Sequence, residues 1–205
     1  MDNELTIYKE VIALTGSSGS GKSTVAKMLR DLGAHIVSAD EFSREAVAKG
    51  SVALEELVAE FGPESVLETG DLDRKFLRYA IFSDSTKKKK VEAIIHPKVK
   101  ALAIKAFKSA LEANSKPIIY DVPLYFEAGL DKLPFKGVIL IYADDDVCIQ
   151  RIMQRDNLSQ QEAEIRLKNQ LPSEEKMKGA TYIINNSGSL ADLEMAVRQL
   201  WEAFK

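Results

Sequence analysis

The sequence GSSGSGKS at residues 16–23 constrains this chain more than any other feature. It lies between an apolar run, VIALT at 11–15, and a segment with helical periodicity. Glycines in such a loop allow backbone angles that a side chain would prevent, so successive N–H groups can point inward at an anion. The following helix adds its positive N-terminal end. The pattern predicts a phosphate-binding loop; a Gly/Ser-rich loop without a ligand is the alternative.

The loop matches the pattern G-x-x-x-x-G-K-[ST], in the strand–loop–helix context that the pattern requires. We expect the Lys22 ammonium to reach the β- and γ-phosphates of a nucleotide, and the Ser23 hydroxyl to help hold Mg²⁺. Thr24 is expected near the α-phosphate. The predicted nucleotide-binding residues of this segment are Gly16, Gly19, Ser20, Gly21, Lys22, Ser23 and Thr24.

Short apolar runs alternate with helical patterns along much of the chain, which predicts an α/β fold with a five-stranded parallel sheet flanked by helices. The predicted strands are 11–15, 35–39, 117–122, 138–142 and 181–185. Most are nearly continuous in apolar residues, as strands buried on both faces should be. The first helix is expected to end at Gly33, and the last to begin at Ser189 with a capping box to Asp192.

Two segments interrupt the alternation. Residues 41–113 have helical patterns throughout, which is too much helix for one crossover, so we interpret them as an inserted helical acceptor lobe. Residues 144–172 are charged and helical in pattern, end at Pro172, and are interpreted as a lid. The chain is thus predicted to be a single domain, 1–205, whose core comprises about 8–40, 114–143 and 173–205.

Composition limits the classes of partner. The net charge of -3 offers no general attraction to nucleic acid or to an anionic membrane, so an anionic ligand needs a local site. The KKKK run at 87–90 is interpreted as a solvated helix face, with phosphate binding as the alternative. A single cysteine, Cys148, argues against disulfides and cysteine-based zinc sites. We expect a cytoplasmic protein without a membrane span or secretory signal, either monomeric or weakly self-associating.

Phosphate-binding loops of this type occur in kinases, GTPases and ATP-driven motors. The chain lacks the N-K-x-D sequence with which GTPases read guanine. A motor would usually be larger and carry paired acidic residues after a strand, whereas IIYDVP (118–123) has only Asp121. A small kinase with ATP as donor fits best. The alternatives are a kinase for another small molecule, such as a nucleoside or uridine, and a slow regulatory nucleotide-binding protein.

Asp40 directly follows the strand predicted at 35–39. Ligands of parallel sheets gather at the carboxyl ends of the strands, so Asp40 is a candidate to accept the proton of an attacking hydroxyl. The alternative is a cap for the helix expected at 41–49. The sequence leaves both open.

Other polar residues are candidates for the acceptor side. Arg74 and Arg78 have i,i+4 spacing, for which surface salt bridging is the alternative. His96 precedes Pro97, which suits the first turn of a following helix, and a cap or a packed side chain is the more usual role for such a histidine.

The segment DVPLYFEAG (121–129) follows a predicted buried strand. Asp121 is a candidate to hold a Mg²⁺-bound water, with a strand-end turn as the alternative. Glu127 is expected at the edge of the same crevice.

Charged helices over 150–170 carry Arg151, Arg155 and Arg166. Arginines on a mobile lid would close over a triphosphate and exclude water. Three solvated arginines are the alternative.

Taken in order, several segments resemble the dephospho-coenzyme A kinase family and span nearly the whole chain. They are TGSSGSGKST, SADEFSREA, GDLDRKFLRYAIF, IIHPKV, DVPLYFEAG, QRIMQR with LSQQEAEIRLKNQ, and IINNSGS. The resemblance implies transfer of the γ-phosphate of ATP to the ribose 3′-hydroxyl of dephospho-coenzyme A, the last step of coenzyme A synthesis. It also implies a P-loop kinase fold with a helical coenzyme A lobe and a two-helix lid.

The resemblance also implies roles for particular residues. Asp40 becomes the expected catalytic acid or base, and Lys22, Arg151 and Arg155 are expected to act on the phosphates. Substrate-binding residues would be Asp40, Arg44, Arg74, His96, Asp121 and Glu127, and Asn186 would contact the nucleotide.

The chain departs from the family pattern at a few positions. Ser38 replaces the first carboxylate of D-A-D, which leaves the Mg²⁺ or water network around Asp40 less defined. Tyr125 stands in DVPLYFE where leucine is usual and is expected to alter the pocket wall, and Thr181 follows Ala180 where the family has aspartate.

Overall fold

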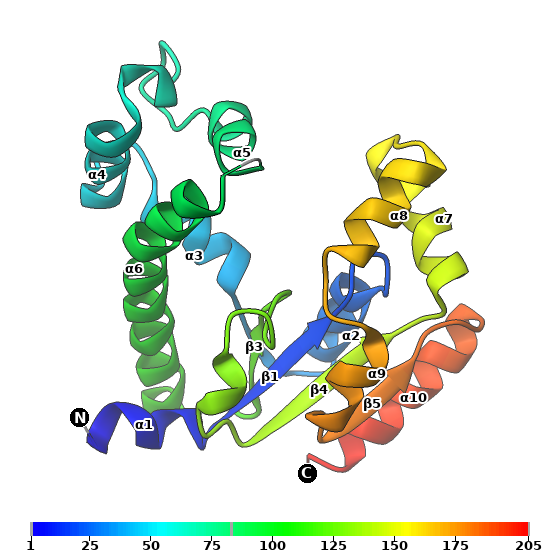
Figure 1. The fold of residues 1–205 in the computed structure, drawn as a ribbon. Helices are drawn as coiled ribbons and strands as arrows, with labels where there is room; N and C mark the ends of the chain where they lie inside the picture. The colour runs from blue at the N-terminus through cyan, green and yellow to red at the C-terminus, as the bar shows by residue number, and fades with distance from the viewer. Residues whose placement is uncertain (1, 83, 205) are drawn as a thin grey trace. The chain divides into compact units, whose positions relative to one another are not determined.

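The computed structural model describes residues 2–82 and 84–204 (Figure 1). Helices and strands alternate in the first and last parts of the chain, and helices occupy the middle. The elements are α1 (Asp2–Tyr8), β1 (Val11–Gly16), α2 (Lys22–Asp31), β2 (His35–Ser38), α3 (Ala39–Ala46), α4 (Val52–Phe61), η1 (Pro63–Ser65), α5 (Arg74–Phe82), α6 (Ser85–Glu112), β3 (Ile118–Asp121), η2 (Leu130–Lys132), β4 (Gly137–Tyr142), α7 (Asp145–Asp156), α8 (Gln160–Lys168), α9 (Ser173–Lys178), β5 (Tyr182–Asn185) and α10 (Leu190–Glu202).

The strands form one parallel sheet in the order β2-β3-β1-β4-β5, so the predicted five-stranded parallel sheet is confirmed. The predicted strand ends differ from the observed ones by no more than one residue. Every residue of β1 is buried, as its apolar sequence requires. The strand order reverses beside β1, because β2 and β3 lie on one side of it and β4 and β5 on the other. Ligands of such sheets bind at this switch point, outside the carboxyl ends of the strands.

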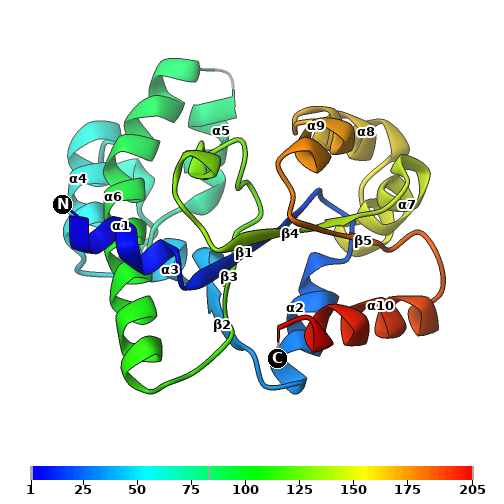
Figure 2. The ribbon, with the colours of Figure 1, turned by 90° about the horizontal axis from the view of Figure 1, so that it is seen from below.

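Helices cover both faces of the sheet. On one face α2 and α10 pack side by side (Figure 2), and the buried cluster there includes Leu14, Leu29, Ile141 and Val197. On the other face an aromatic group joins Tyr8, Phe107, Tyr120 and Phe135 through edge-to-face and stacked contacts. Burying both faces holds the sheet rigid, so the loops at its carboxyl edge have a fixed base.

The ends of the two helices on that first face follow the predicted signals. The chain leaves α2 through Gly33, whose φ of 112° is a conformation that glycine adopts readily. The side chain of Ser189 accepts a hydrogen bond from the Asp192 N–H, and the Asp192 carboxylate accepts one from the Ser189 N–H, which forms the predicted capping box. The Ser189 hydroxyl also donates a hydrogen bond of 2.6 Å to the Asp192 carboxylate, and this bond, followed by that from the Ser189 N–H, lowers the pKa of the Asp192 carboxyl.

The chain divides into two compact units. One contains the chain up to Ser38 and from Phe107 onward, and the other is Ala39–Ala106. The second unit has its own apolar core, formed by α4, the segment before α5, α5 itself and the first half of α6, whose buried members include Leu54, Leu57, Leu72 and Leu77. It overlaps the segment interpreted as the acceptor lobe, 41–113.

The middle of α6 contradicts one local prediction. Pro97 was expected to start a new helix, whereas α6 runs without interruption from Ser85 to Glu112 with Pro97 inside it. A proline in a helix removes one hydrogen bond and crowds the preceding turn. Apolar residues on both sides of it, Ile94 and Ile95 before and Phe107 after, pack into cores and keep the helix continuous.

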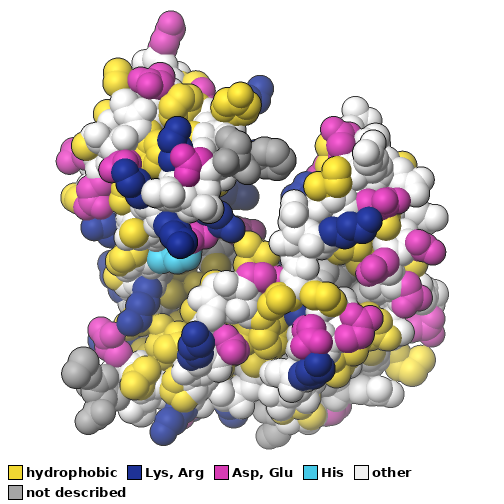
Figure 3. Space-filling model, in the orientation of Figure 1, with side chains coloured by type: hydrophobic (Ala, Val, Ile, Leu, Met, Phe, Trp, Pro, Cys, Tyr) yellow, Lys and Arg dark blue, Asp and Glu magenta, His cyan; other side chains and the backbone are white. Residues whose placement is uncertain are grey.

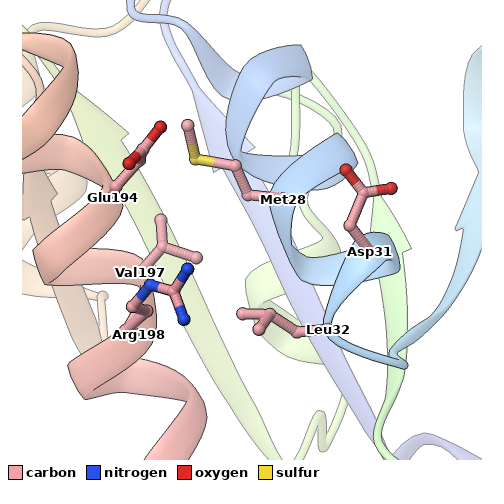
Figure 4. A pocket seen from close by; sticks show the side chains of 6 residues that line it. All are labelled: Met28, Asp31, Leu32, Glu194, Val197 and Arg198. Atoms are coloured by element: carbon pink, nitrogen blue, oxygen red, sulfur yellow. The ribbon is translucent and has the colours of Figure 1, made fainter.

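The outside of the molecule carries charges of both signs. On the face shown in Figure 3, Lys and Arg side chains are interspersed with Asp and Glu. In the described parts of the chain, no helix is both long enough and apolar enough to cross a membrane. A cavity of about 290 Å³ lies between α2 and α10, lined by Met28, Asp31, Leu32, Glu194, Val197 and Arg198 (Figure 4). It adjoins the C-terminal half of α2, whereas the predicted phosphate loop precedes the N-terminal end.

Candidate active site

The loop between β1 and α2 has the backbone that the sequence pattern predicts. β1 ends at Gly16 and α2 begins at Lys22, with Gly21 in the left-handed conformation (φ 90°, ψ 18°) at the N-cap. Gly19 also has positive φ, at 79°. Among the described residues no side chain caps α2. The first N–H groups of α2 are thus available for an anion at the positive end of the helix.

Each glycine of the loop also meets a close neighbour. A Cβ on Gly16 would lie 2.4 Å from the Ile141 carbonyl oxygen, and one on Gly19 would lie 2.5 Å from the Cys148 carbonyl oxygen. A Cβ on Gly21 would lie 2.1 Å from Nδ2 of Asn186. The glycine spacing is therefore required by packing against β4, α7 and the loop after β5, in addition to the backbone angles.

Replacing Gly19 with alanine is expected to destabilise the fold by about 2–4 kcal/mol, because left-handed backbone strain adds to a collision with helix backbone. Urea unfolding measures the loss. Gly129→Ala is the matched control, since Gly129 has φ 68° but open space around its Cβ position, and it should lose only about 1–2 kcal/mol. Equal losses in the two variants would mean that the contact with Cys148 has no effect.

Arg151 and Asn186 bond to the loop from two other elements. In α7, Arg151 donates from Nη1 to the Gly19 carbonyl (3.3 Å) and from Nη2 to the Asn186 carbonyl (3.0 Å). The buried side chain of Asn186 donates from Nδ2 to the Ser20 carbonyl at 2.7 Å. Both residues were candidates from the sequence, and the structure brings them together at the loop.

Arg155 does not join them. Its guanidinium donates from Nε and Nη2 to the Asp156 carboxylate, at 2.9 and 2.8 Å, and Arg166 contacts the same carboxylate at 2.5 Å. The hydrogen bond from Arg155 holds the pKa of the Asp156 carboxyl below its usual range and raises the pKa of Arg155. Arg155 is more than half exposed, so in this structure it belongs to a surface charge cluster at the junction of α7 and α8.

The Lys22 ammonium contacts the Asp121 carboxylate, and both side chains are mostly buried, at 14% and 15% exposed. Asp121 ends β3, opposite Leu14 of β1 on one side and Ser38 of β2 on the other. The carboxylate therefore holds the ammonium beside the loop.

Hydroxyl groups complete the loop region. The Ser20 hydroxyl is buried and has no hydrogen-bond partner within the described residues, so the protein leaves this polar group of the loop unsatisfied. Ser23 and Thr24 lie in the first turn of α2 and are exposed.

Hydroxyl and carboxylate oxygens are the ligands that Mg²⁺ prefers, so Ser23 and Asp121 fit that ion chemically. The described parts of the chain contain no group of three or more His, Cys, Asp or Glu that could hold a metal. An ion held mainly by substrate phosphates needs no such group.

Four candidates lie in the unit Ala39–Ala106. Asp40 is exposed and lies in the first turn of α3. The helix was expected at 41–49, but β2 ends at Ser38 and α3 begins at Ala39. A carboxylate there still faces the positive end of the helix. Arg44 is exposed in the last turn of α3, and Arg74 is exposed as the first residue of α5. His96 is exposed in the middle of α6, so it precedes no helix start, contrary to expectation.

Glu127 has protein partners that the sequence did not reveal. Its carboxylate lies 2.9 Å from the ammonium of Lys176 in α9 and accepts a hydrogen bond of 3.1 Å from the Leu171 N–H. Lys176 is completely buried and donates to the Ser17 hydroxyl at 3.2 Å. Lys176 was not a candidate from the sequence, because SEEKMK has the pattern of an ordinary charged helix. Nothing local distinguishes its lysine from the exposed Lys178.

Tyr125 packs inside the first unit. It is 2% exposed, with its ring edge-to-face against Phe126 and Phe135. Burial raises the pKa of its hydroxyl to about 12, with a smaller contribution from Asp131. The phenol is therefore neutral at physiological pH.

Comparison with known proteins agrees with this geometry. The CoaE family model, dephospho-CoA kinase, matches residues 10–192. The chain is 36% identical over 197 residues to a dephospho-CoA kinase of Geobacillus kaustophilus, and the alignment covers 95% of this chain and 98% of that protein. It is 42% identical over 180 residues to one of Syntrophotalea carbinolica, covering 88% and 85%.

Solved structures give the same result. A Thermus thermophilus protein, TT1252, superposes with a TM-score of 0.79 at 35% identity, covering 95% of this chain and 97% of that one. A dephospho-CoA kinase from Campylobacter jejuni superposes with a TM-score of 0.70 at 31% identity, covering 94% and 96%. With a phosphate loop after the central strand and relatives that align over nearly their whole length, this chain belongs to the dephospho-CoA kinase family.

Proposed function

We propose that the protein transfers the γ-phosphate of ATP to the 3′-hydroxyl of the ribose in dephospho-coenzyme A, giving coenzyme A and ADP in the last step of coenzyme A biosynthesis. The observation that carries this proposal is the family match over residues 10–192, because the loop alone occurs in many kinds of protein. The described geometry of the loop supports a nucleoside triphosphate as the donor, and the family match supports ATP.

The loop residues would neutralise the triphosphate. Uncapped N–H groups at the start of α2 would bind phosphate oxygens, and the Lys22 ammonium would turn from Asp121 toward the β- and γ-phosphates. We propose that Ser23 holds Mg²⁺ directly and Asp121 holds it through water. Bound there, the ion would offset negative charge on the phosphates. Gly16, Gly19, Ser20, Gly21, Thr24 and Asn186 would shape the loop around the nucleotide.

On the acceptor side we propose Asp40 as the group that takes the hydroxyl proton. The 3′-oxygen forms a bond to the γ-phosphorus, the bond from that phosphorus to the bridging β,γ-oxygen breaks, and ADP leaves with the electron pair. The hydroxyl proton passes to the Asp40 carboxylate. Arg44, Arg74 and His96 carry positive or hydrogen-bonding groups suited to an acceptor that contains phosphates.

The helical pair α7 and α8 would serve as the lid. Arg151 already bonds to the Gly19 carbonyl, which supports a role for it beside the triphosphate. Arg155 would have to leave Asp156 to join it. Glu127 was expected to bind substrate, and its contacts with Lys176 and Leu171 support a role in holding the loop region instead.

The test of function is acceptor-dependent phosphate transfer. Purified protein is incubated with Mg-ATP and dephospho-coenzyme A, and mass spectrometry is used to look for one added phosphate on the acceptor. Parallel reactions contain uridine or no acceptor. Phosphorylation of dephospho-coenzyme A alone supports the proposal. Phosphorylation of the nucleoside would favour a nucleoside kinase. A rate of ADP release that is the same with and without an acceptor would favour a regulatory nucleotide-binding protein.

We also propose that the protein acts in the cytoplasm, as a monomer or a weak homo-oligomer, on small molecules and without nucleic acid or membrane partners. The net charge of -3 supports the last point, since it provides no general attraction to polyanions.

A further inference from the structure

Lys176 is a buried cation that none of the steps above uses. Its side chain is 0% exposed, and its ammonium lies 2.9 Å from Glu127 Oε1 and 3.2 Å from the Ser17 hydroxyl. Burying an ammonium is strongly unfavourable unless partners compensate it, and an apolar side chain of similar volume would fill the space without that penalty. The charge at this position therefore calls for an explanation other than packing.

Ser17 is the residue on which the turn of the phosphate loop closes. It follows Gly16 at the end of β1, and its carbonyl accepts a hydrogen bond of 3.1 Å from the Ser20 N–H. It is 7% exposed. Lys176 thus holds the hydroxyl of the same residue whose carbonyl defines the turn.

The connection between α8 and α9 holds the loop at a second point. The Gln170 side-chain carbonyl accepts a hydrogen bond of 2.9 Å from the Ser18 N–H, and Leu171 bonds to Glu127, the partner of Lys176. A cavity of about 230 Å³ lies here, with Ser17, Gln170 and Leu171 among its lining residues. Because this side of the loop adjoins open space, polar contacts have a larger part in fixing its conformation than close packing does.

We propose that Lys176 is a positioning residue for ATP binding. Anchored by Glu127, its ammonium fixes Ser17 and thereby holds the loop in the conformation that presents its N–H groups to phosphate. This inference rests on the proposed function only because it requires the loop to bind ATP. It does not depend on which acceptor is phosphorylated. Losing a charge-assisted hydrogen bond at this point is expected to raise the Kd for Mg-ATP about tenfold.

The main experiment compares Lys176→Met with Lys178→Met by calorimetric titration with Mg-ATP. Lys178 lies in the same helix, but its side chain is 70% exposed and pairs with Glu175. We expect about a tenfold weaker Kd for Lys176→Met and no more than about a twofold change for Lys178→Met. Lys176→Met with a lower urea midpoint but a wild-type Kd would overturn the proposal, because that is the result of a purely structural role.

Two further variants keep the test decisive if Lys176→Met does not fold. Lys176→Gln retains a donor without the charge, and Ser17→Ala removes the hydroxyl while leaving the Lys176–Glu127 pair intact. If Lys176 acts through Ser17, Ser17→Ala also weakens ATP binding, and adding Lys176→Gln to it weakens binding little further. Independent, additive effects, or no effect of Ser17→Ala, would overturn the proposal. The titration measures ATP binding directly. A wild-type protein that bound ATP without phosphorylating dephospho-coenzyme A would therefore refute the proposed acceptor, but the role of Lys176 in ATP binding could still be tested.

Discussion

Replacing Lys22 with alanine is expected to lower the rate of phosphate transfer by at least about a thousandfold, because we propose that its ammonium offsets the negative charge on the β- and γ-phosphate oxygens in the transition state. The change also leaves the largely buried Asp121 carboxylate without its cation. Lys22→Met, which keeps most of the aliphatic stem, should therefore be measured beside it, with both rates expressed per folded protein.

Steady-state kinetics with Mg-ATP and dephospho-coenzyme A supplies the measurement. Lys27→Ala is the matched control, since Lys27 lies in the same helix but its side chain is 72% exposed, paired with Asp31 at 2.6 Å. Its rate should stay near that of the wild type, because an exposed i,i+4 pair contributes only about 0.3–0.5 kcal/mol. Turnover by Lys22→Ala close to the wild-type value would refute the assignment of the phosphate loop.

Asp40→Asn is expected to lower kcat about a hundredfold or more, since the amide cannot accept the proton of the attacking hydroxyl. The Kd for Mg-ATP should change little, because Asp40 is not among the residues assigned to the nucleotide. A fall in kcat without a rise in the Kd for the donor indicates an interaction made mainly in the transition state.

Glu45→Gln is the control for this variant, because Glu45 is an exposed carboxylate in the same helix, α3. A structural role for Asp40 in the first turn of α3 would instead give a loss of about 0.3–1 kcal/mol in urea unfolding with kcat per folded protein preserved. That result would identify Asp40 as a helix-end residue and would require another group to receive the proton.

Local patterns were sufficient for the sheet and for the loop. Strands buried on both faces need continuous apolar sequence, so the run before GSSGSGKS could be assigned without tertiary information, and so could the other strands. The glycines were equally informative, because positive φ at Gly19 and Gly21 follows from the same pattern that binds phosphate. Ser189 and Asp192 form their capping box within four residues, so that helix start was predictable too.

Local signals failed where packing between distant segments decided the outcome. Pro97 has the ordinary features of a helix start, yet the apolar residues on both sides of it hold α6 in one piece. The start of α3 at Ala39, which shortens the preceding strand, likewise gave no local signal. Arg151 and Arg155 look alike in sequence, and only the fold places one at the loop and the other beside Asp156.

By itself, the sequence determined the family and a parallel sheet whose central strand leads into a phosphate-binding loop. It could do so because periodicity and glycine spacing are properties of neighbouring residues. The tertiary structure alone decided which side chains hold that loop. Lys176 and Gln170 lie more than 150 positions from the serines they contact. A buried charge is recognisable only once its partners have been brought around it.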